Sequence, residues 1–259
     1  MSSDFIIGTT AQLTLFCLIL MRMSGFILLN PILGRSNIPM QVKGGFIFIL
    51  TLAVYSFSAG EAFETASTIE FGFLLIKEFA AGYVIGLVTQ LFFFIISFGG
   101  YIIDFQMGLS MATVYDPQSN AQMPVTGSIY QTWLMLLFFA VDGHLALMKI
   151  LVTSAEIVPY GGILITQTLA SRMLEIFYQC VEMGVRLALP MIAAEFLVEI
   201  GVGIMNKVVP QISIFVINIQ MKLIVGLVLL VVLFSPTGEY LEKVMTTMLK
   251  TVQGILTFL

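Results

Sequence analysis

Long apolar stretches, separated by short polar loops, constrain this chain more than any other feature of its sequence. There are six of them, over about residues 11–34, 44–60, 70–103, 127–153, 170–204 and 210–235. A helix needs roughly 20 mainly apolar residues to cross a bilayer, and these stretches lack the alternation of barrel strands. The sequence therefore predicts an all-α membrane protein of about six long, partly kinked apolar helices in hairpins. An amphipathic tail over about 237–257 is expected to follow.

Charged residues are too scarce to cover a surface that faces water. The chain is 59% hydrophobic and 10% charged, whereas soluble domains are about 25% charged. Lipid or other protein chains must therefore cover most of the surface. The 15 acids and 11 bases include no basic run that would bind a phosphate backbone by releasing counterions. We expect membrane lipid as a partner, and no nucleic acid.

Residue types that carry catalysis and metal binding are also scarce. Cys17 and Cys180 lie inside apolar stretches, and a single His excludes a His-rich metal site. The sequence has no phosphate-binding Gly-Lys-Ser loop, no His-Glu-x-x-His motif and no convincing pair of base and nucleophile. We expect no catalytic residues, no metal, no cofactor and no enzymatic activity.

Loop charges and glycines give a first topology. No base precedes the first stretch, so we expect that stretch to be retained rather than cleaved as a signal. Arg35 and Lys43 bracket the first loop, which places it in the cytoplasm and both termini outside. Gly99-Gly100 predicts a bend in the third helix. Gly82 and Gly86 have the spacing that lets two helix backbones approach closely.

The stretch that joins the third and fourth helices, 104–127, differs in character from the other loops. It is neither apolar enough to span a membrane nor charged enough to be well solvated, and Asp116-Pro117 predicts a turn. Three methionines are spread among its small residues: Met107, Met111 and Met123. Non-helical backbone is tolerated at membrane depth where it lines a cavity or is buried in protein. The segment is therefore either a loop that folds back into a lumen or a plain interfacial connector.

Several motifs resemble the FliR family of flagellar export-gate proteins. They are Asn30-Pro31 with Gly34 and Ile38-Pro39, Gln106 to Gly108, Asp116-Pro117-Gln118-Ser119 with Pro124, and Asp142-Gly143-His144. The last hairpin of the family, which resembles FliQ, is similar to a pattern near the end of this chain. The pattern comprises Glu195, Glu199 and Gly201, then Asn206-Lys207 and Pro210-Gln211, then Lys222 and Gly226-Leu227. Ile219-Gln220-Met221-Lys222 departs from the Leu-Pro-Leu-Lys that the family often has there.

The resemblance implies an architecture and a set of partners. It implies a FliP-like part over 1–168 and a FliQ-like hairpin with its tail over 169–259. The chain is then expected to assemble with FliP and FliQ into a gate that associates with FlhB and FlhA-like proteins, in the bacterial inner membrane at the flagellar basal body. Unfolded flagellar proteins are expected to pass through it. The injectisome homologue of needle-type secretion shares the architecture, but the Asp116 to Ser119 block looks more flagellar.

The resemblance also implies that segment 104–127 lies in the pore and helps to close it at rest. The residues expected to carry closure are Phe105, Met107, Gly108, Met111, Tyr115, Asp116, Pro117, Met123 and Pro124.

Charges inside the apolar helices are expected to form pairs, because an ionisable group at membrane depth is costly. Glu182 and Arg186 have the favourable acid-first spacing of one helical turn. Folding the last hairpin about residue 207 brings Lys222 within about a turn of Glu195, so Lys222 is expected to pair with Glu195 or Glu199. A proton relay is the sharper alternative for these acids. Pairing or interfacial positions are also expected for Glu78 with Lys77 and for Asp142 with His144.

Two other classes of function compete with a gate subunit. A secondary transporter for a small solute would show two halves related as repeats, with broken helices at the midplane, and the halves of this chain show no convincing repeat. An intramembrane enzyme would need a catalytic dyad, for which the chain offers no candidate.

Overall fold

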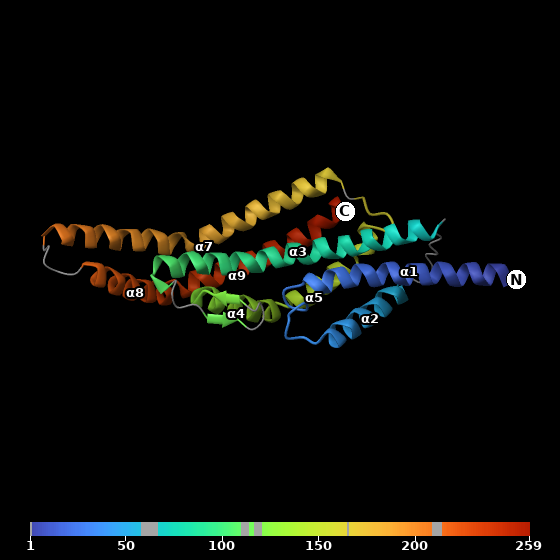
Figure 1. Ribbon diagram of the computed structural model, residues 1–259, viewed down its shortest axis with the longest axis horizontal. Helices are drawn as coiled ribbons and strands as arrows, with labels where there is room; N and C mark the ends of the chain where they lie inside the picture. The colour runs from blue at the N-terminus through green and yellow to red at the C-terminus, as the bar shows by residue number, and fades with distance from the viewer. Residues whose placement is uncertain (1, 58–66, 110–113, 117–120, 165, 209–213) are drawn as a thin grey trace. The chain divides into compact units, whose positions relative to one another are not determined.

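Long helices make up nearly all of the structure, a computed structural model that describes residues 2–57, 67–109, 114–116, 121–164, 166–208 and 214–259 (Figure 1). The helices are α1 (Ser2–Leu29), α2 (Met40–Phe57), α3 (Thr68–Gln106), α4 (Val125–Ala140), α5 (Gly143–Val152), α6 (Ser154–Ile157), α7 (Gln167–Val208), α8 (Ile214–Val232), α9 (Phe234–Ile255) and the 3₁₀ turn η2 (Leu256–Phe258). Two short strands, β1 (Val114–Asp116) and β2 (Ala121–Met123), form a hairpin between α3 and α4.

The predicted all-α membrane protein is confirmed. Four of the described helices, α1, α2, α3 and α7, are long and apolar enough to cross a membrane. Two bent pairs raise the number to six if each pair is one span: α4 with α5, bent by 68°, and α8 with α9, bent by 64°. The fourth predicted helix is thus two helices, and the predicted tail is the second arm of a bent pair.

The break between α4 and α5 lies at Asp142. This residue adopts a φ of 54°, a left-handed conformation that Asp tolerates better than most side chains. The end of α1 has an equally local cause, because a residue that precedes proline is pushed out of the helical region. The Asn30 side chain then accepts hydrogen bonds from the backbone N–H groups of Ile32 and Leu33, at 2.9 and 3.0 Å.

The chain divides into two compact units, each built from separate stretches of sequence. Unit 1 comprises Met1–Gln90, Gly143–Ile176 and Met248–Leu259, and unit 2 comprises Leu91–Asp142 and Phe177–Thr247. Helices α3, α7 and α9 therefore contribute residues to both. The predicted boundary at residue 168 separates a FliP-like part from a FliQ-like part rather than two compact units, and it stays a prediction.

Glycines set the contact between α1 and α3 in unit 1. A Cβ at Gly82 would meet the backbone carbonyl oxygen of Arg22, and one at Gly86 would lie 2.9 Å from that of Phe26. The predicted close approach at Gly82 and Gly86 is therefore confirmed. Helix α2 packs on α1 as a hairpin, with the Phe16 and Tyr55 rings edge to face at 5.8 Å.

The glycine pair of α3 lies at a close contact between three helices. Helix α3 runs without a break through Gly99 and Gly100 to Gln106. A Cβ at Gly100 would collide with the backbone of Gly127 near the start of α4, and one at Gly99 would lie 3.0 Å from the carbonyl oxygen of Gly184 in α7. The small residues thus let three helices of unit 2 meet closely, and the predicted bend at this pair stays a prediction.

Candidate functional site

A buried carboxylate joins the two ends of segment 104–127. Asp104, in the last turn of α3, accepts hydrogen bonds from the backbone N–H of Thr126, 3.2 and 3.3 Å from its two oxygens, and from the Thr126 hydroxyl. Both residues are buried. The side chain of Pro124 makes no capping hydrogen bond to α4, so Asp104 caps that helix from a different element. A carboxylate suits this position because the first N–H groups of a helix lack partners and carry partial positive charge.

A methionine fixes the chain just beyond α3. Met107 is buried, and a Cβ at Gly226 of α8 would meet the Met107 Cγ, Cε and Sδ atoms at 2.5 to 3.0 Å. Gly108 then turns the chain with a φ of 76°, a conformation that glycine adopts without a steric penalty. The first predicted closure methionine is therefore an anchor between α3 and α8 in this conformation.

The middle of segment 104–127 is non-helical, as the sequence predicts, and contains a β-hairpin that it does not predict. Strands β1 and β2 are antiparallel, with Val114 opposite Met123, Tyr115 opposite Gln122 and Asp116 opposite Ala121. The chain thus reverses after Asp116, where the turn is predicted. Met111 and Pro117 lie outside the described residues. Of the other closure residues, Phe105 is exposed and Pro124 is half-buried.

Two charge pairs lie on helices α7 and α8. Arg186 donates to Glu182 at 2.6 Å, one turn apart on the exposed surface of α7. Lys222 of α8 pairs with Glu199 of α7. Glu195, one turn before Glu199, is fully buried, and neither of its carboxylate oxygens has a hydrogen-bond partner in the part of the chain that the structure describes. Of the two acids expected near Lys222, the lysine therefore binds Glu199.

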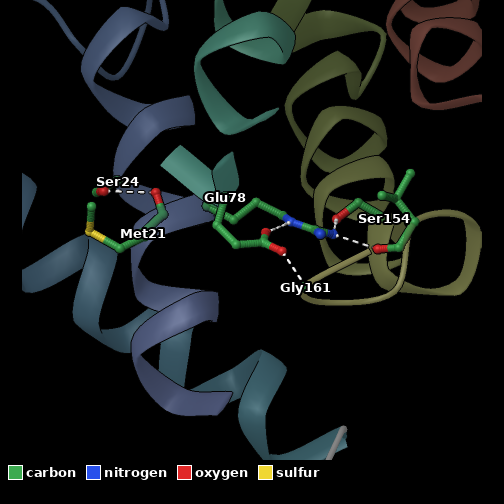
Figure 2. Close-up of polar contacts among 7 residues, drawn as sticks. Met21, Ser24, Glu78, Ser154 and Gly161 are labelled. Atoms are coloured by element: carbon green, nitrogen blue, oxygen red, sulfur yellow. Dashed lines mark hydrogen bonds and ion pairs between the residues drawn. The ribbon is translucent and has the colours of Figure 1, made fainter. Parts of the chain in front are cut away.

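A fully buried ion pair holds unit 1 together. The Arg22 Nε lies 2.6 Å from the Glu78 Oε2, and the two side chains are 1% and 0% exposed. The Arg22 Nη1 also donates to the Ser154 hydroxyl at 3.2 Å and to the Val158 carbonyl at 3.0 Å. Figure 2 shows Glu78 between this arginine and the loop at Gly161, whose N–H donates to the Glu78 Oε1 at 2.8 Å.

This cluster corrects one sequence interpretation. The sequence predicts pairing or interfacial positions for Glu78 and Lys77, whereas in the structure Glu78 is fully buried and its partner is Arg22. The guanidinium also lies 4.4 Å from the centre of the Tyr160 ring, within the range of a cation–π contact. Sequence reasoning missed Arg22, although a lone ionisable residue inside the first apolar stretch is the kind of signal that marks a site.

The buried carboxylates of Asp104 and Glu78 connect helices that are distant in the sequence. In the described ranges, no group of three or more His, Cys, Asp and Glu side chains is placed to hold a metal ion. Each oxygen of the Asp104 and Glu78 carboxylates accepts at least one hydrogen bond from another element. Each therefore closes a junction: Asp104 between α3 and α4, and Glu78 between α1, α3 and the loop after α6.

Comparison with known proteins identifies the family. The sequence model of "Bacterial export proteins, family 1" matches residues 13–248. The chain belongs to this family. The match includes all of segment 104–127 and both hairpin helices α7 and α8, so the family resemblance of the sequence is confirmed.

Relatives in this family align over most of their length. The chain is 29% identical over 248 residues to "Flagellar biosynthetic protein FliR" of Bacillus subtilis (strain 168), covering 93% of this chain and 94% of the relative. It is 29% identical over 237 residues to the protein of the same name from Escherichia coli (strain K12), covering 92% and 90%. It is 25% identical over 235 residues to "Yop proteins translocation protein T" of Yersinia pestis, covering 89% of each.

Proposed function

We propose that this chain is a structural subunit of the flagellar type III export gate in the bacterial inner membrane. With FliP and FliQ it forms the pore through which unfolded flagellar proteins leave the cytoplasm, next to FlhB and FlhA-like proteins at the basal body. Segment 104–127 helps to close this pore at rest. The chain itself catalyses no covalent chemistry. Full-length similarity to flagellar biosynthetic proteins carries this proposal.

Exposed apolar side chains support assembly with partner helices. Phe196 and Leu197 of α7 are 61% and 69% exposed, and Val231 of α8 is 77% exposed. Such surfaces are covered by lipid or by protein. The charged side chains of the same helices, including Glu182 and Arg186 at 59% and 61% exposure, are costly against lipid. A surface that carries both exposed apolar and charged side chains is better covered by neighbouring protein subunits than by lipid.

The geometry of segment 104–127 supports a closing role. Its ends are fixed, at one side by Met107 against Gly226 and at the other by Asp104 on Thr126. Non-helical backbone between two membrane helices requires an aqueous or protein environment. Short apolar constrictions in such a place can block ions by dewetting. A tethered hairpin with soft Met side chains is therefore suited to seal a pore and to repack around a passing chain.

The decisive experiment combines purification and conductance. The chain, expressed with FliP-like and FliQ-like chains, should copurify with them in mild detergent. The Met111→Gly/Met123→Gly variant should assemble equally well and make cells or vesicles leaky to ions, because the seal loses its side chains. Met40→Gly/Met221→Gly is the matched control, since both methionines are exposed outside the segment, and it should not leak.

Other outcomes of this experiment would favour a different function for the segment or for the chain. Normal assembly with conductance at the closed wild-type level would make the segment a connector. A stable monomer that binds or moves a small solute would favour the secondary transporter. Copurification with needle-secretion subunits instead of flagellar ones would favour the injectisome homologue.

A further inference from the structure

The one fully buried charge-bearing side chain without a partner among the described residues is Glu195 in α7. The others that are fully buried, Arg22, Glu78 and Asp104, are all hydrogen-bonded. Glu195 is 0% exposed, and both of its carboxylate oxygens are buried and unpaired. An ionised carboxylate in that state is strongly disfavoured, whereas a neutral carboxylic acid is not.

The charges around Glu195 do not neutralise it in this conformation. Those that face it are Lys222 from α8 and Glu199 on its own helix. The Lys222 ammonium is bound to Glu199, and Glu199 adds a negative charge one turn away. The Lys222 ammonium, the only nearby cation in the described hairpin, is therefore already paired with another acid.

We propose that Glu195 is a proton-binding site, which holds a proton while Lys222 is bound to Glu199. When the proton leaves to water, the negative charge on Glu195 is neutralised by Lys222, which moves from one acid to the other. Glu199 tolerates the loss of its partner, because its side chain is 47% exposed and can be solvated or take up a proton itself. One lysine shared by two acids thus gives the α7–α8 hairpin two charge states.

The position of Glu195 connects this site to segment 104–127. Lys222 of α8 lies against Glu199 of α7, and Gly226 lies one turn further along α8. Because α7 and α8 run in opposite directions, Glu195 and Gly226 lie at the same level of the hairpin. Gly226 is the residue on which Met107 packs. A change of charge at Glu195 would therefore act on the contact that anchors the segment.

Infrared difference spectroscopy on the assembled complex tests this site directly. A protonated carboxylic acid has a C=O stretch of its own, separate from that of a carboxylate. The wild-type complex at neutral pH should show this band, and raising the pH should remove it. Glu195→Gln should lack the band, and Glu199→Gln should weaken it at the same pH, because Lys222 is then free to neutralise Glu195. Glu182→Gln, which replaces an exposed acid of the same helix that pairs with Arg186, is the matched control and should keep the band.

The result that overturns the proposal is equally specific. An identical band in the wild type and in Glu195→Gln would show that Glu195 is not the protonated group. Failure of Glu195→Gln to assemble would also contradict it, because a neutral isostere replaces a neutral acid without stranding a charge; the yield should stay within about twofold of wild type. The link to segment 104–127 rests on the proposed gate function. The two fail in different ways, because the band reports the acid itself, whereas copurification and conductance report the gate.

Discussion

Replacing Arg22 with Met should destabilise unit 1 severely. The change removes the Nε contact to Glu78 and the Nη1 contacts to Ser154 and Val158, while the methionine fills much of the same volume. Glu78, 0% exposed, then keeps the N–H of Gly161 as its one donor among the described residues. Breaking a buried pair by removing one partner costs about 3 to 5 kcal/mol, equivalent to a loss on the order of a hundredfold to a few thousandfold in the folding equilibrium.

The assay is the thermal stability and yield of the assembled complex in mild detergent, with two further variants. Arg22→Met/Glu78→Gln removes both charges, and it should recover much of the lost stability because no charge is left buried alone. Arg186→Met is the matched control: its partner Glu182 is exposed, so the loss should be at most about 1 kcal/mol. Equal stability of Arg22→Met and wild type would refute the reasoning, as would a double variant no better than the single one.

Three further predictions concern unit 2 and the helix contacts. Asp104→Ala removes the cap of α4 and should cost about 0.5 to 2 kcal/mol, seen as a lower midpoint of complex unfolding, while Thr126→Ser, which keeps the hydroxyl, should stay near wild type. Lys222→Met should leave complex yield within about twofold of wild type, because Glu199 is 47% exposed and can be solvated without its partner; a severalfold loss of yield would contradict that tolerance. Gly82→Leu should abolish assembly because its side chain would meet the backbone of α1, and normal yield would disprove that contact.

The helices of this fold can be predicted from sequence because their cause is local. Apolar stretches of spanning length, the Asn30-Pro31 end of α1 and the turn after Asp116 all follow from a few neighbouring residues. The α4–α5 break at Asp142 is local too, but it depends on a left-handed conformation that many Asp residues do not adopt. Because the residues on both sides of this break are mainly apolar, hydropathy alone predicts a single helix there.

Contacts between distant residues could not be predicted in the same way. Gly99 and Gly100 admit two neighbouring helices, and the sequence does not predict which helices these are. The partner of Glu78 is 56 residues away in Arg22, so the adjacent Lys77 was the wrong choice. Met107 resembles the other methionines of its segment in sequence, yet it is buried against Gly226 of α8. Hydrophobicity and spacing do not encode which helix lies opposite.

The most direct test of the proposed export gate is site-specific crosslinking at Phe105 in the assembled complex. This side chain is 62% exposed at the start of segment 104–127. A photoreactive phenylalanine at this position can therefore react with a polypeptide that passes the segment. With an export substrate stalled in transit, we predict a crosslink between residue 105 and the substrate, and none from the same group at Val231 on the exposed face of α8. Crosslinks only to lipid or to neighbouring subunits at residue 105, with the substrate demonstrably stalled, would contradict the claim that this segment lines the export path.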